Sequence, residues 1–300
     1  MRMREILVTG ATGQVGGFIA GECRDDVAFV ALPRSDCDLA DRGSITRAVS
    51  MRPWAGVINA AAYTAVDLAE SEPEAAWCVN AQAMQWLAEA TARIGIPLVH
   101  VSTDYVFSGD LDRPYEEDDP HCPLGVYGAS KAAGEQRIRA AHPRHAILRT
   151  SWVMSERGQN FAKTMLRLAR ERTTLDIVAD QHGAPTHARD LAQALMKVAA
   201  RLASDPDAAT GTFHYTGDGA ATWADVAEEI FRVSRACGGP FATVNRVDSA
   251  AFARPAPRPK NSRLAAGRLV SAFGVTRRPW RECVSDIVQQ IMASERSVPS

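Results

Sequence analysis

Short apolar runs alternate with helical patterns through the first half of the chain. The runs lie at residues 5–9, 27–32, 56–62, 97–103 and 145–150. Strands that follow one another through helices form right-handed parallel units, and the helices cover both faces of the sheet. The alternation therefore predicts an α/β fold with a Rossmann-like, doubly wound parallel sheet.

This rhythm changes after Thr150, where helices and short strands follow one another less regularly. We expect residues 1–150 and about 173–217 to form a nucleotide-binding lobe. Residues of about 151–172 and 218–300 would form a smaller mixed α/β lobe that binds the substrate. The chain would then cross between the two lobes more than once.

Composition excludes several classes of protein. The chain has 300 residues and a formal net charge of -1, which argues against a nucleic-acid partner. No apolar stretch approaches the ~20 residues of a membrane span, and the N-terminus lacks a secretory pattern, so we expect a cytoplasmic protein. The six cysteines are scattered and form no CxxC, which predicts free thiols rather than a zinc site or a disulfide framework.

A glycine-rich turn, TGATGQVGG, follows the first predicted strand and precedes a predicted helix. Gly10, Gly13 and Gly16 permit unusual backbone angles and a close approach of the backbone to a ligand. Backbone amides at the start of a helix suit a pyrophosphate. In this strand–turn–helix context the spacing predicts a dinucleotide site.

The end of the second predicted strand distinguishes the two nicotinamide cofactors. An acidic residue there would hold the free ribose hydroxyl of NAD, but the chain has Pro33 and Arg34 instead. The Arg34 guanidinium could pair with a 2′-phosphate, which favours NADPH and leaves NADH as a substitute. The alternative is that Arg34 is only a solvated surface charge.

The motif YGASK places Tyr127 and Lys131 four residues apart, hence on one face of a helix. An ammonium group beside a phenol favours the phenolate, which makes the phenol a better acid toward a carbonyl oxygen that gains charge. An isolated YxxxK is common by chance. Thr103, at the carboxyl end of a predicted strand, adds a hydroxyl where ligands of open parallel sheets bind, and the three groups together indicate a reductase site.

Motifs along nearly the whole chain resemble the extended short-chain dehydrogenase/reductase superfamily and, within it, the dTDP-4-dehydrorhamnose reductase family. They are TGATGQVGG, VINAAAYTAVDLAESEPEAAWCVNA, STDYVFSG, PLGVYGASKAAGE, LRTSWV, NFAKTMLRLA, DQHGAPT and RPKNSRL. The resemblance implies reduction of the C4 ketone of dTDP-4-dehydro-β-L-rhamnose by NAD(P)H.

The resemblance also implies which residues hold the cofactor. The pyrophosphate turn would contribute Gly13, Gln14 and Val15. Asp38 and Leu39 would contact the adenine. The loop after the third strand would contribute Ala62, Tyr63 and Thr64. Tyr127 would be the proton donor, with Thr103 and Lys131 completing the catalytic set. Asn80 matches an asparagine that supports the lysine, although a bond to nearby backbone is an equal alternative.

The substrate would meet residues of both lobes. Asp104 and Trp152 would touch or orient the sugar. A basic segment carries Arg254, Arg258, Lys260 and Arg263, and we expect Arg258 with Asn261 to meet the dTDP group. A solvated basic loop is the alternative.

Some members of the family are described as magnesium-linked dimers that use acidic residues, one of them early in the first helix. Phe18 stands near that position here, so the sequence argues against a metal and leaves monomer or homodimer open. Two alternatives to the reductase also stay open: a catalytically idle NADP-binding regulatory subunit, and a related nucleotide-sugar reductase or epimerase.

Overall fold

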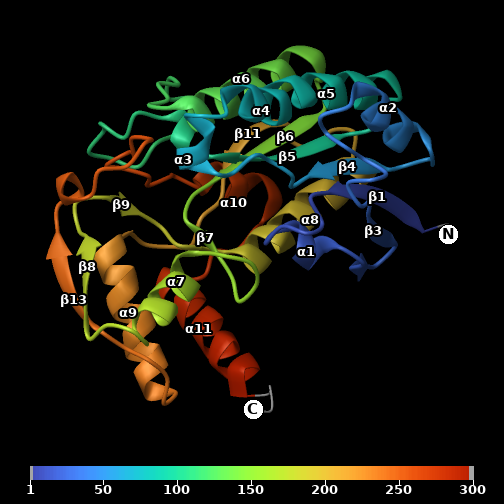
Figure 1. The fold of residues 1–300 in the computed structure, drawn as a ribbon. Helices are drawn as coiled ribbons and strands as arrows, with labels where there is room; N and C mark the ends of the chain where they lie inside the picture. Colours follow the sequence, from blue (N-terminus) through green and yellow to red (C-terminus); the bar gives the residue numbers. More distant parts are fainter. Residues whose placement is uncertain (1–2, 297–300) are drawn as a thin grey trace.

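A computed structural model describes residues 3–296 of the chain. Its centre is a seven-stranded sheet in the order β11-β6-β5-β4-β1-β3-β2, parallel except for the edge strand β2 (Figure 1). The strands are β1 (Arg4–Thr9), β2 (Cys23–Arg24), β3 (Val27–Ala31), β4 (Gly56–Asn59), β5 (Leu98–Thr103), β6 (His145–Thr150) and β11 (Gly211–His214). The predicted doubly wound parallel sheet is confirmed.

Helices cover both faces of this sheet, as Figure 1 shows. One face carries α2 (Arg42–Ser50), α5 (Ala83–Arg93) and α6 (Val126–Ala141), and the other carries α1 (Gly16–Ile19), α8 (Ala188–Ser204) and α10 (Gly267–Phe273). Each face buries its own apolar cluster. Leu7 and Val57 belong to the first cluster, and Ile6 and Ile58 to the second, as the alternation of side chains along a strand requires.

The strand order reverses at β1, which pairs with β3 on one side and β4 on the other. Such a switch point opens a crevice beyond the carboxyl ends of the strands. Gly10 turns the chain out of β1 with φ of +79°, and a Cβ atom there would lie 2.6 Å from the Ala61 nitrogen. Only glycine fits between these two chain segments.

The sequence pattern over residues 70–94 predicts one long helix, but in the structure this stretch is interrupted. The structure has α3 (Val66–Ala69), α4 (Pro73–Trp77), a π-helical turn (Cys78–Gln82) and then α5. The extra residue in the π-turn accompanies a tertiary contact, because the Asn80 side chain bonds both the backbone N–H and C=O of Tyr63. The first helix is also shorter than expected, since α1 is a single turn before the chain enters the β2–β3 hairpin.

The second lobe packs three helices around a separate apolar cluster. These helices are α7 (Phe161–Leu168), α9 (Trp223–Ala236) and α11 (Trp280–Arg296). Beside them β8 (Thr174–Val178) pairs in parallel with β13 (Thr243–Val247). In Figure 1 this lobe lies on one side of the large sheet.

Two short pairings and two 3-10 turns complete the fold. The remaining strands are β7 (Val153–Met154), β9 (His182–Gly183), β10 (Thr186–His187) and β12 (Ala221–Thr222), and the 3-10 turns are Asp104–Val106 and Ser249–Ala251. β7 pairs with β10, and β9 pairs with β12.

The lobe boundaries differ from those expected in two places. β8 lies within the predicted 173–217 part of the nucleotide lobe, but Leu175 and Ile177 are buried in the second lobe's cluster. α10 lies within the predicted 218–300 part of the substrate lobe, but Leu269 and Phe273 pack into the nucleotide lobe's core. Both differences arise because burial of apolar side chains against distant elements, rather than position in the chain, assigns a segment to a lobe.

Within residues 3–296, no helix is long and apolar enough to cross a membrane.

Candidate active site

α6 carries both Tyr127 and Lys131 across the carboxyl end of β5, where Thr103 ends the strand. The helix sits unusually close to its neighbours. A Cβ atom on Gly128 would collide with the Tyr105 carbonyl oxygen, and one on Gly134 would collide with that of Asn80. These two glycines let α6 hold its side chains directly over the sheet edge.

Tyr127 is held as a neutral phenol. Burial raises its pKa to about 12, an interaction with the Thr103 hydroxyl opposes that rise, and the nearby Asp104 charge adds to it. The Tyr105 ring meets the Tyr127 ring edge-on, with centroids 5.5 Å apart. Tyr127 therefore carries a proton at neutral pH and has Thr103 beside it, as the predicted catalytic pair requires.

Asp104 directly follows Thr103 and is 4% exposed. One carboxylate oxygen accepts from the Thr103 hydroxyl at 3.1 Å, whereas the other, Oδ2, is buried without a hydrogen-bond partner. Burial raises the pKa of Asp104 to about 6, and interactions with the hydroxyl groups of Ser262 and Thr103 oppose that rise. A buried acceptor without a donor is costly, so this oxygen is suited to accept from a bound hydroxyl group.

Lys131 is 1% exposed, and burial lowers its pKa to about 8. Its Nζ donates to the Val101 carbonyl at 2.7 Å and lies 3.1 Å from Nε2 of His100. Asn80, the expected support of the lysine, instead bonds Tyr63 and the Ser130 hydroxyl. His100 was not predicted, although its place three residues before Thr103 on a buried strand is visible in the sequence.

A buried ion pair anchors α6 one turn beyond Lys131. Both carboxylate oxygens of Glu135 accept from Arg149 of β6, at 2.9 and 2.7 Å, and one of them accepts from the Ser102 hydroxyl at 2.5 Å. Arg149 and His121 hold the pKa of the Glu135 carboxyl well below its usual range, against the effect of burial. The pair thus ties the catalytic helix to the two strands beneath it.

The glycine-rich turn has the cradle shape that a pyrophosphate needs. The Gly13 N–H donates to the Gly10 carbonyl at 3.0 Å, and a Cβ atom on Gly16 would collide with that same carbonyl. Val15 is buried in the core beneath the turn. This tight backbone, between a strand and a helix, fits a dinucleotide.

Gln14 differs from its neighbours because its side chain joins the two lobes. Its Oε1 accepts from the Ser155 hydroxyl and from Nδ2 of Asn160, both at 2.9 Å. Asn160 is also the N-cap of α7. A residue predicted to touch the cofactor therefore also connects the glycine-rich turn to the second lobe.

The other predicted cofactor residues lie around the same sheet edge. Ala62, Tyr63 and Thr64 form the loop after β4, and Asn80 fixes this loop through Tyr63. Arg34 follows β3 with its side chain 81% exposed and 3.4 Å from Asp38. Arg34 is thus accessible to a 2′-phosphate.

Beyond these positions, Leu39 is buried against α2, and Asp38 is bonded to backbone and hydroxyl groups at the start of that helix. Both flank the side of the crevice predicted for adenine. Their side chains are held by the fold before any ligand binds.

A cavity of about 880 Å³ extends from Tyr105 into the second lobe. Tyr105 contacts Tyr127, so the cavity begins beside the predicted catalytic residues. Its lining combines apolar, aromatic and basic side chains, among them Phe161, Leu168, Arg172, Trp223, Arg254 and Arg258. Aromatic faces together with guanidinium groups suit a nucleoside diphosphate.

Arg258 faces this cavity as predicted, but it already has a partner. Its guanidinium makes a bidentate pair with Asp67 of α3, at 2.6 and 2.8 Å. Arg254 lies 3.8 Å from the same carboxylate and is more exposed. The pair orients Arg258 across the mouth of the cavity, between the two lobes.

Asn261 has a different role from the one predicted. Its amide donates to the carbonyls of Leu111 and Arg113 at 2.6 and 2.8 Å, and its oxygen accepts from the backbone and side chain of Arg263. With both ends occupied by protein groups, the buried amide braces a loop and is not available to a substrate.

Trp152 has a strained backbone, with φ of +49°, directly after β6. Its ring stacks on Trp223 with centroids 3.7 Å apart, and Gly183 supplies the space beside it. Trp223 lines the cavity, whereas Trp152 supports it from behind. Sequence reasoning missed Trp223, because it lies at the start of α9, far from every motif.

The Phe18 side chain supplies no oxygen ligand for magnesium. Guanidinium groups of Arg157 and Arg189 lie over its ring, at 4.2 and 5.2 Å from the centroid. Magnesium needs oxygen ligands, so an aromatic ring between two cations does not fit it. Throughout residues 3–296 no three His, Cys, Asp or Glu side chains gather closely enough to hold a metal ion.

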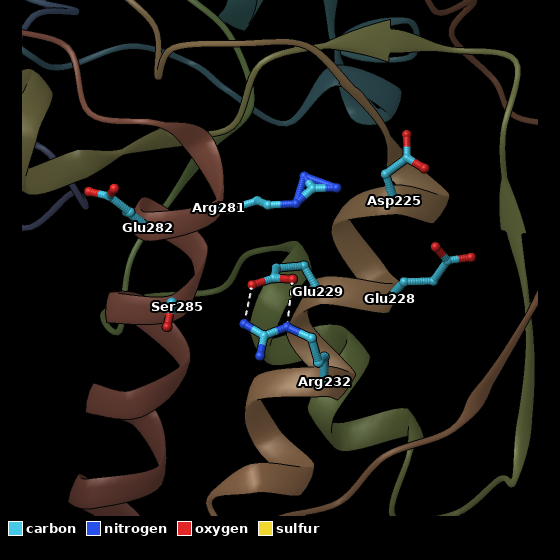
Figure 2. A pocket seen from close by; sticks show the side chains of 7 residues that line it. All are labelled: Asp225, Glu228, Glu229, Arg232, Arg281, Glu282 and Ser285. Carbon is cyan, nitrogen blue, oxygen red and sulfur yellow. Dashed lines mark hydrogen bonds and ion pairs between the residues drawn. The ribbon is translucent and has the colours of Figure 1, made fainter.

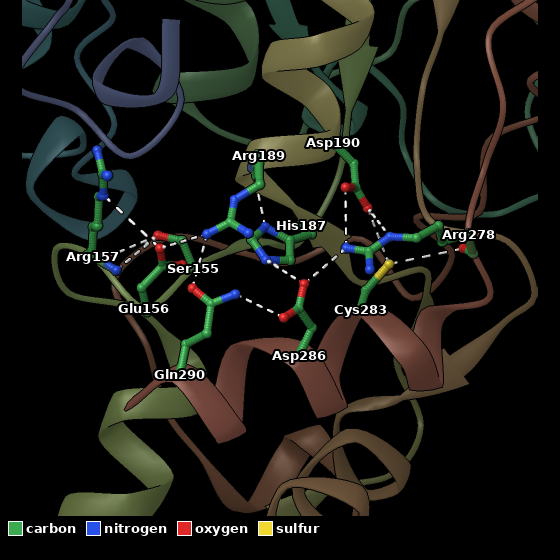
Figure 3. Close-up of polar contacts among 10 residues, drawn as sticks. All are labelled: Ser155, Glu156, Arg157, His187, Arg189, Asp190, Arg278, Cys283, Asp286 and Gln290. Carbon is green, nitrogen blue, oxygen red and sulfur yellow. Dashed lines mark hydrogen bonds and ion pairs between the residues drawn. The ribbon is translucent and has the colours of Figure 1, made fainter. Parts of the chain in front are cut away.

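The neighbouring polar contacts join the lobes instead. Figure 3 shows Arg189 of α8 reaching Gln290 of α11, at 2.8 Å, while Arg278 pairs with Asp190 and Asp286. A second hollow, between α9 and α11, is lined by charged groups, with Glu229 and Arg232 paired to each other (Figure 2). Neither region touches Thr103, Tyr127 or Lys131.

Comparison with known proteins adds to this geometry. A family model described as RmlD substrate binding domain matches residues 3–293. The chain is 42% identical over 288 residues to a dTDP-4-dehydrorhamnose reductase of Sinorhizobium fredii (strain NBRC 101917 / NGR234), covering 96% of this chain and 97% of that protein. It is 39% identical over 296 residues to the protein of that name from Escherichia coli (strain K12), covering 96% and 98%.

A solved structure is similar over the same length. The crystal structure of dTDP-4-dehydrorhamnose reductase from Bacillus anthracis str. Ames in complex with NADP superposes with a TM-score of 0.88. The two chains are 32% identical, and the match covers 97% of this chain and 100% of the other.

Proposed function

Because this chain belongs to the dTDP-4-dehydrorhamnose reductase family, we propose that it reduces the C4 ketone of dTDP-4-dehydro-β-L-rhamnose with NADPH. The product is dTDP-L-rhamnose, and the reaction is the last step of dTDP-rhamnose biosynthesis. One observation carries the proposal: Tyr127, which interacts with Thr103 and shares α6 with Lys131, contacts Tyr105 at the edge of a cavity whose lining suits a nucleoside diphosphate. A cytoplasmic location, as monomer or homodimer, belongs to the same proposal.

In this reaction NADPH supplies the hydride that becomes bonded to C4 of the sugar. The carbonyl oxygen gains negative charge and takes the phenolic proton of Tyr127, so the products are an alcohol and NADP⁺. Thr103 turns its hydroxyl proton, which Asp104 accepts in the structure, toward the same oxygen. Lys131, with its pKa of about 8, is mostly protonated at neutral pH and returns a proton to the Tyr127 phenolate.

The other side chains orient the two ligands. Oδ2 of Asp104 accepts from a sugar hydroxyl, which satisfies its missing hydrogen bond. Arg258 and Arg254 meet the diphosphate, and Trp223 offers a flat apolar face. Asp67 keeps the Arg258 guanidinium in place.

For the cofactor, the turn from Gly10 to Gly16 would hold the pyrophosphate with its backbone N–H groups. Arg34 would pair with the 2′-phosphate, which accounts for NADPH rather than NADH as the preferred cofactor. Asp38 and Leu39 would border the adenine, and the loop at Ala62–Thr64 would follow the cofactor toward Tyr127.

The test is NADPH oxidation with enzymatically generated dTDP-4-dehydrorhamnose, run beside Tyr127→Phe. We expect the wild type to form dTDP-rhamnose. We expect the variant to lose about 10²–10⁴-fold in kcat, because only the transferred proton is missing, and to bind NADPH with nearly unchanged affinity. Near-normal turnover by the variant would refute Tyr127 as the acid.

An inactive wild type that is folded and binds NADPH would contradict the proposed substrate. It would then favour another nucleotide sugar or a regulatory role.

A further inference from the structure

His100 lies between Lys131 and Asn59 in the buried layer beneath the active site. Nε2 of the imidazole is 3.1 Å from the Lys131 amine, and Nδ1 is 2.9 Å from the Asn59 side-chain nitrogen. All three side chains are at most 1% exposed. Burial and the Lys131 charge lower the pKa of His100 well below its usual value, so the ring is neutral and carries one proton.

The orientation of the Asn59 amide follows from its backbone contacts. Its Oδ1 accepts from the Ala61 N–H at 3.3 Å, and its Nδ2 donates to the Ala61 carbonyl at 3.3 Å. The Thr9 hydroxyl also bonds Oδ1. If the amide were rotated by half a turn, its NH₂ group would face the Ala61 N–H and its oxygen would face the Ala61 carbonyl, and both hydrogen bonds would be lost. Nδ2 is therefore the atom that faces His100.

This orientation decides where the imidazole proton lies. Asn59 Nδ2 has only N–H bonds to offer, so Nδ1 of His100 must accept. The single ring proton is then on Nε2 and points at Lys131. An N–H group stabilises the lone pair of a neutral amine, whereas it cannot accept a hydrogen bond from an ammonium group.

We propose that Asn59 and His100 form a directional hydrogen-bond relay that donates Nε2–H to Lys131 and stabilises its neutral amine, the form left after Lys131 returns a proton to Tyr127. His100 is thus a positioning residue that acts through Lys131. The catalytic meaning of this relay rests on the proposed function, but the relay itself does not.

The charged groups around Lys131 are few. Glu135, one turn further along α6, favours the ammonium form, and its charge also reaches His100. Asp104 acts on Tyr127 from the end of β5. Glu135 raises the pKa of Lys131, so the low value of about 8 comes from burial. The relay also lowers the pKa of Lys131, because it stabilises the neutral amine.

The chain has only four lysines, Lys131, Lys163, Lys197 and Lys260, so the amine can be titrated directly. We would label lysine with ¹³C and ¹⁵N and follow the four side-chain signals against pH by NMR in the whole protein. His100→Leu removes the N–H group that donates to Lys131. Asn59→Leu removes the N–H group that faces Nδ1, so the imidazole proton can move to Nδ1 and Nε2 can accept a hydrogen bond from the Lys131 ammonium group. We expect the pKa of Lys131 to rise by about 0.5–1 unit in both variants.

His145→Leu is the matched control. His145 is also a buried imidazole of the same sheet, but it bonds the His142 carbonyl and not Lys131. We expect no shift of Lys131 in this variant, and none of the other three lysines should move in any variant. An unchanged or lowered pKa of Lys131 in the folded His100→Leu or Asn59→Leu protein would overturn the relay.

This titration needs no substrate, so its result is independent of the proposed reaction. Parallel assays of NADPH oxidation test the catalytic consequence. We expect His100→Leu to lower kcat severalfold with an unchanged KM for NADPH. A change in KM alone would contradict action through Lys131.

Discussion

Glu135→Gln tests whether the catalytic helix depends on its buried ion pair. The substitution keeps the shape of the side chain but removes the charge that faces Arg149. Arg149 is 1% exposed, so its guanidinium would remain charged in a nearly dry site. Its other contacts, the Glu117 carbonyl at 3.0 Å and the imidazoles of His121 and His214, carry no full negative charge.

The expected cost follows from this geometry. Breaking a buried pair by removing one partner leaves an uncompensated charge and costs about 3–5 kcal/mol. Four donors, two from Arg149 and one each from Ser102 and Arg139, lose their charged acceptor at distances of 2.5–3.2 Å. Against a typical total stability of about 5–15 kcal/mol, this loss is large.

Urea denaturation followed by circular dichroism measures the effect. Glu89→Gln is the matched control, because Glu89 also pairs with an arginine, Arg42, at 3.2 Å, but both side chains are exposed. Exposed pairs contribute about 0–1 kcal/mol. If Glu135→Gln destabilised the protein no more than Glu89→Gln, the argument from burial would be refuted.

The same pair predicts a dependence of stability on pH. The pKa of Glu135 is lower in the folded protein than in the unfolded chain, where it is about 4.3. Its stabilising contribution is therefore complete above that pH and is lost as the pH falls toward the folded value. The difference in stability between wild type and Glu135→Gln should shrink as the pH is lowered below about 4, and a constant difference would contradict this linkage.

Two further predictions test the cofactor site and the close packing of α6. Arg34→Ala should weaken NADPH binding about tenfold or more and leave NADH binding nearly unchanged, because one charge-assisted contact with the 2′-phosphate is lost. Calorimetric titration with both cofactors measures the two affinities. Equal weakening of both would contradict a contact between Arg34 and the 2′-phosphate. Gly134→Ala should destabilise the protein by about 1–3 kcal/mol, because the new Cβ collides with the Asn80 carbonyl oxygen. Gly267→Ala is its control in the same denaturation experiment, since a Cβ there meets nothing within 4 Å, and equal stability of the two variants would argue against the collision.

Local motifs predicted the parts of the site that depend on short spacing. Tyr127 and Lys131 share one helix, and their separation alone puts them on one face. Thr103 ends a strand whose carboxyl end must open toward the crevice of a parallel sheet. These inferences need only the period of a helix or strand and the handedness of the connections.

Other residues depend on partners that are far away in the chain. The RPKNS motif predicted that Asn261 would meet the dTDP group, but its amide donates to carbonyls about 150 residues earlier in the chain. Asn80 interrupts a helical pattern because it fixes the loop at Tyr63. No local pattern shows such contacts, since a polar side chain has the same propensity whether or not a distant group satisfies it.

The sequence by itself determined the alternation of strands and helices in the first half of the chain, the glycine-rich turn and the placement of Tyr127 and Lys131 on one helix, because these follow from chain periodicity and backbone sterics. Tertiary structure alone decided that β8 belongs to the second lobe, that Trp223 faces the cavity, and that Lys131 meets His100. The physical reason is that burial and hydrogen bonding are properties of neighbours in space. The proton on His100 depends on the Asn59 amide, and the two side chains meet only because β4 and β5 lie side by side in the folded sheet.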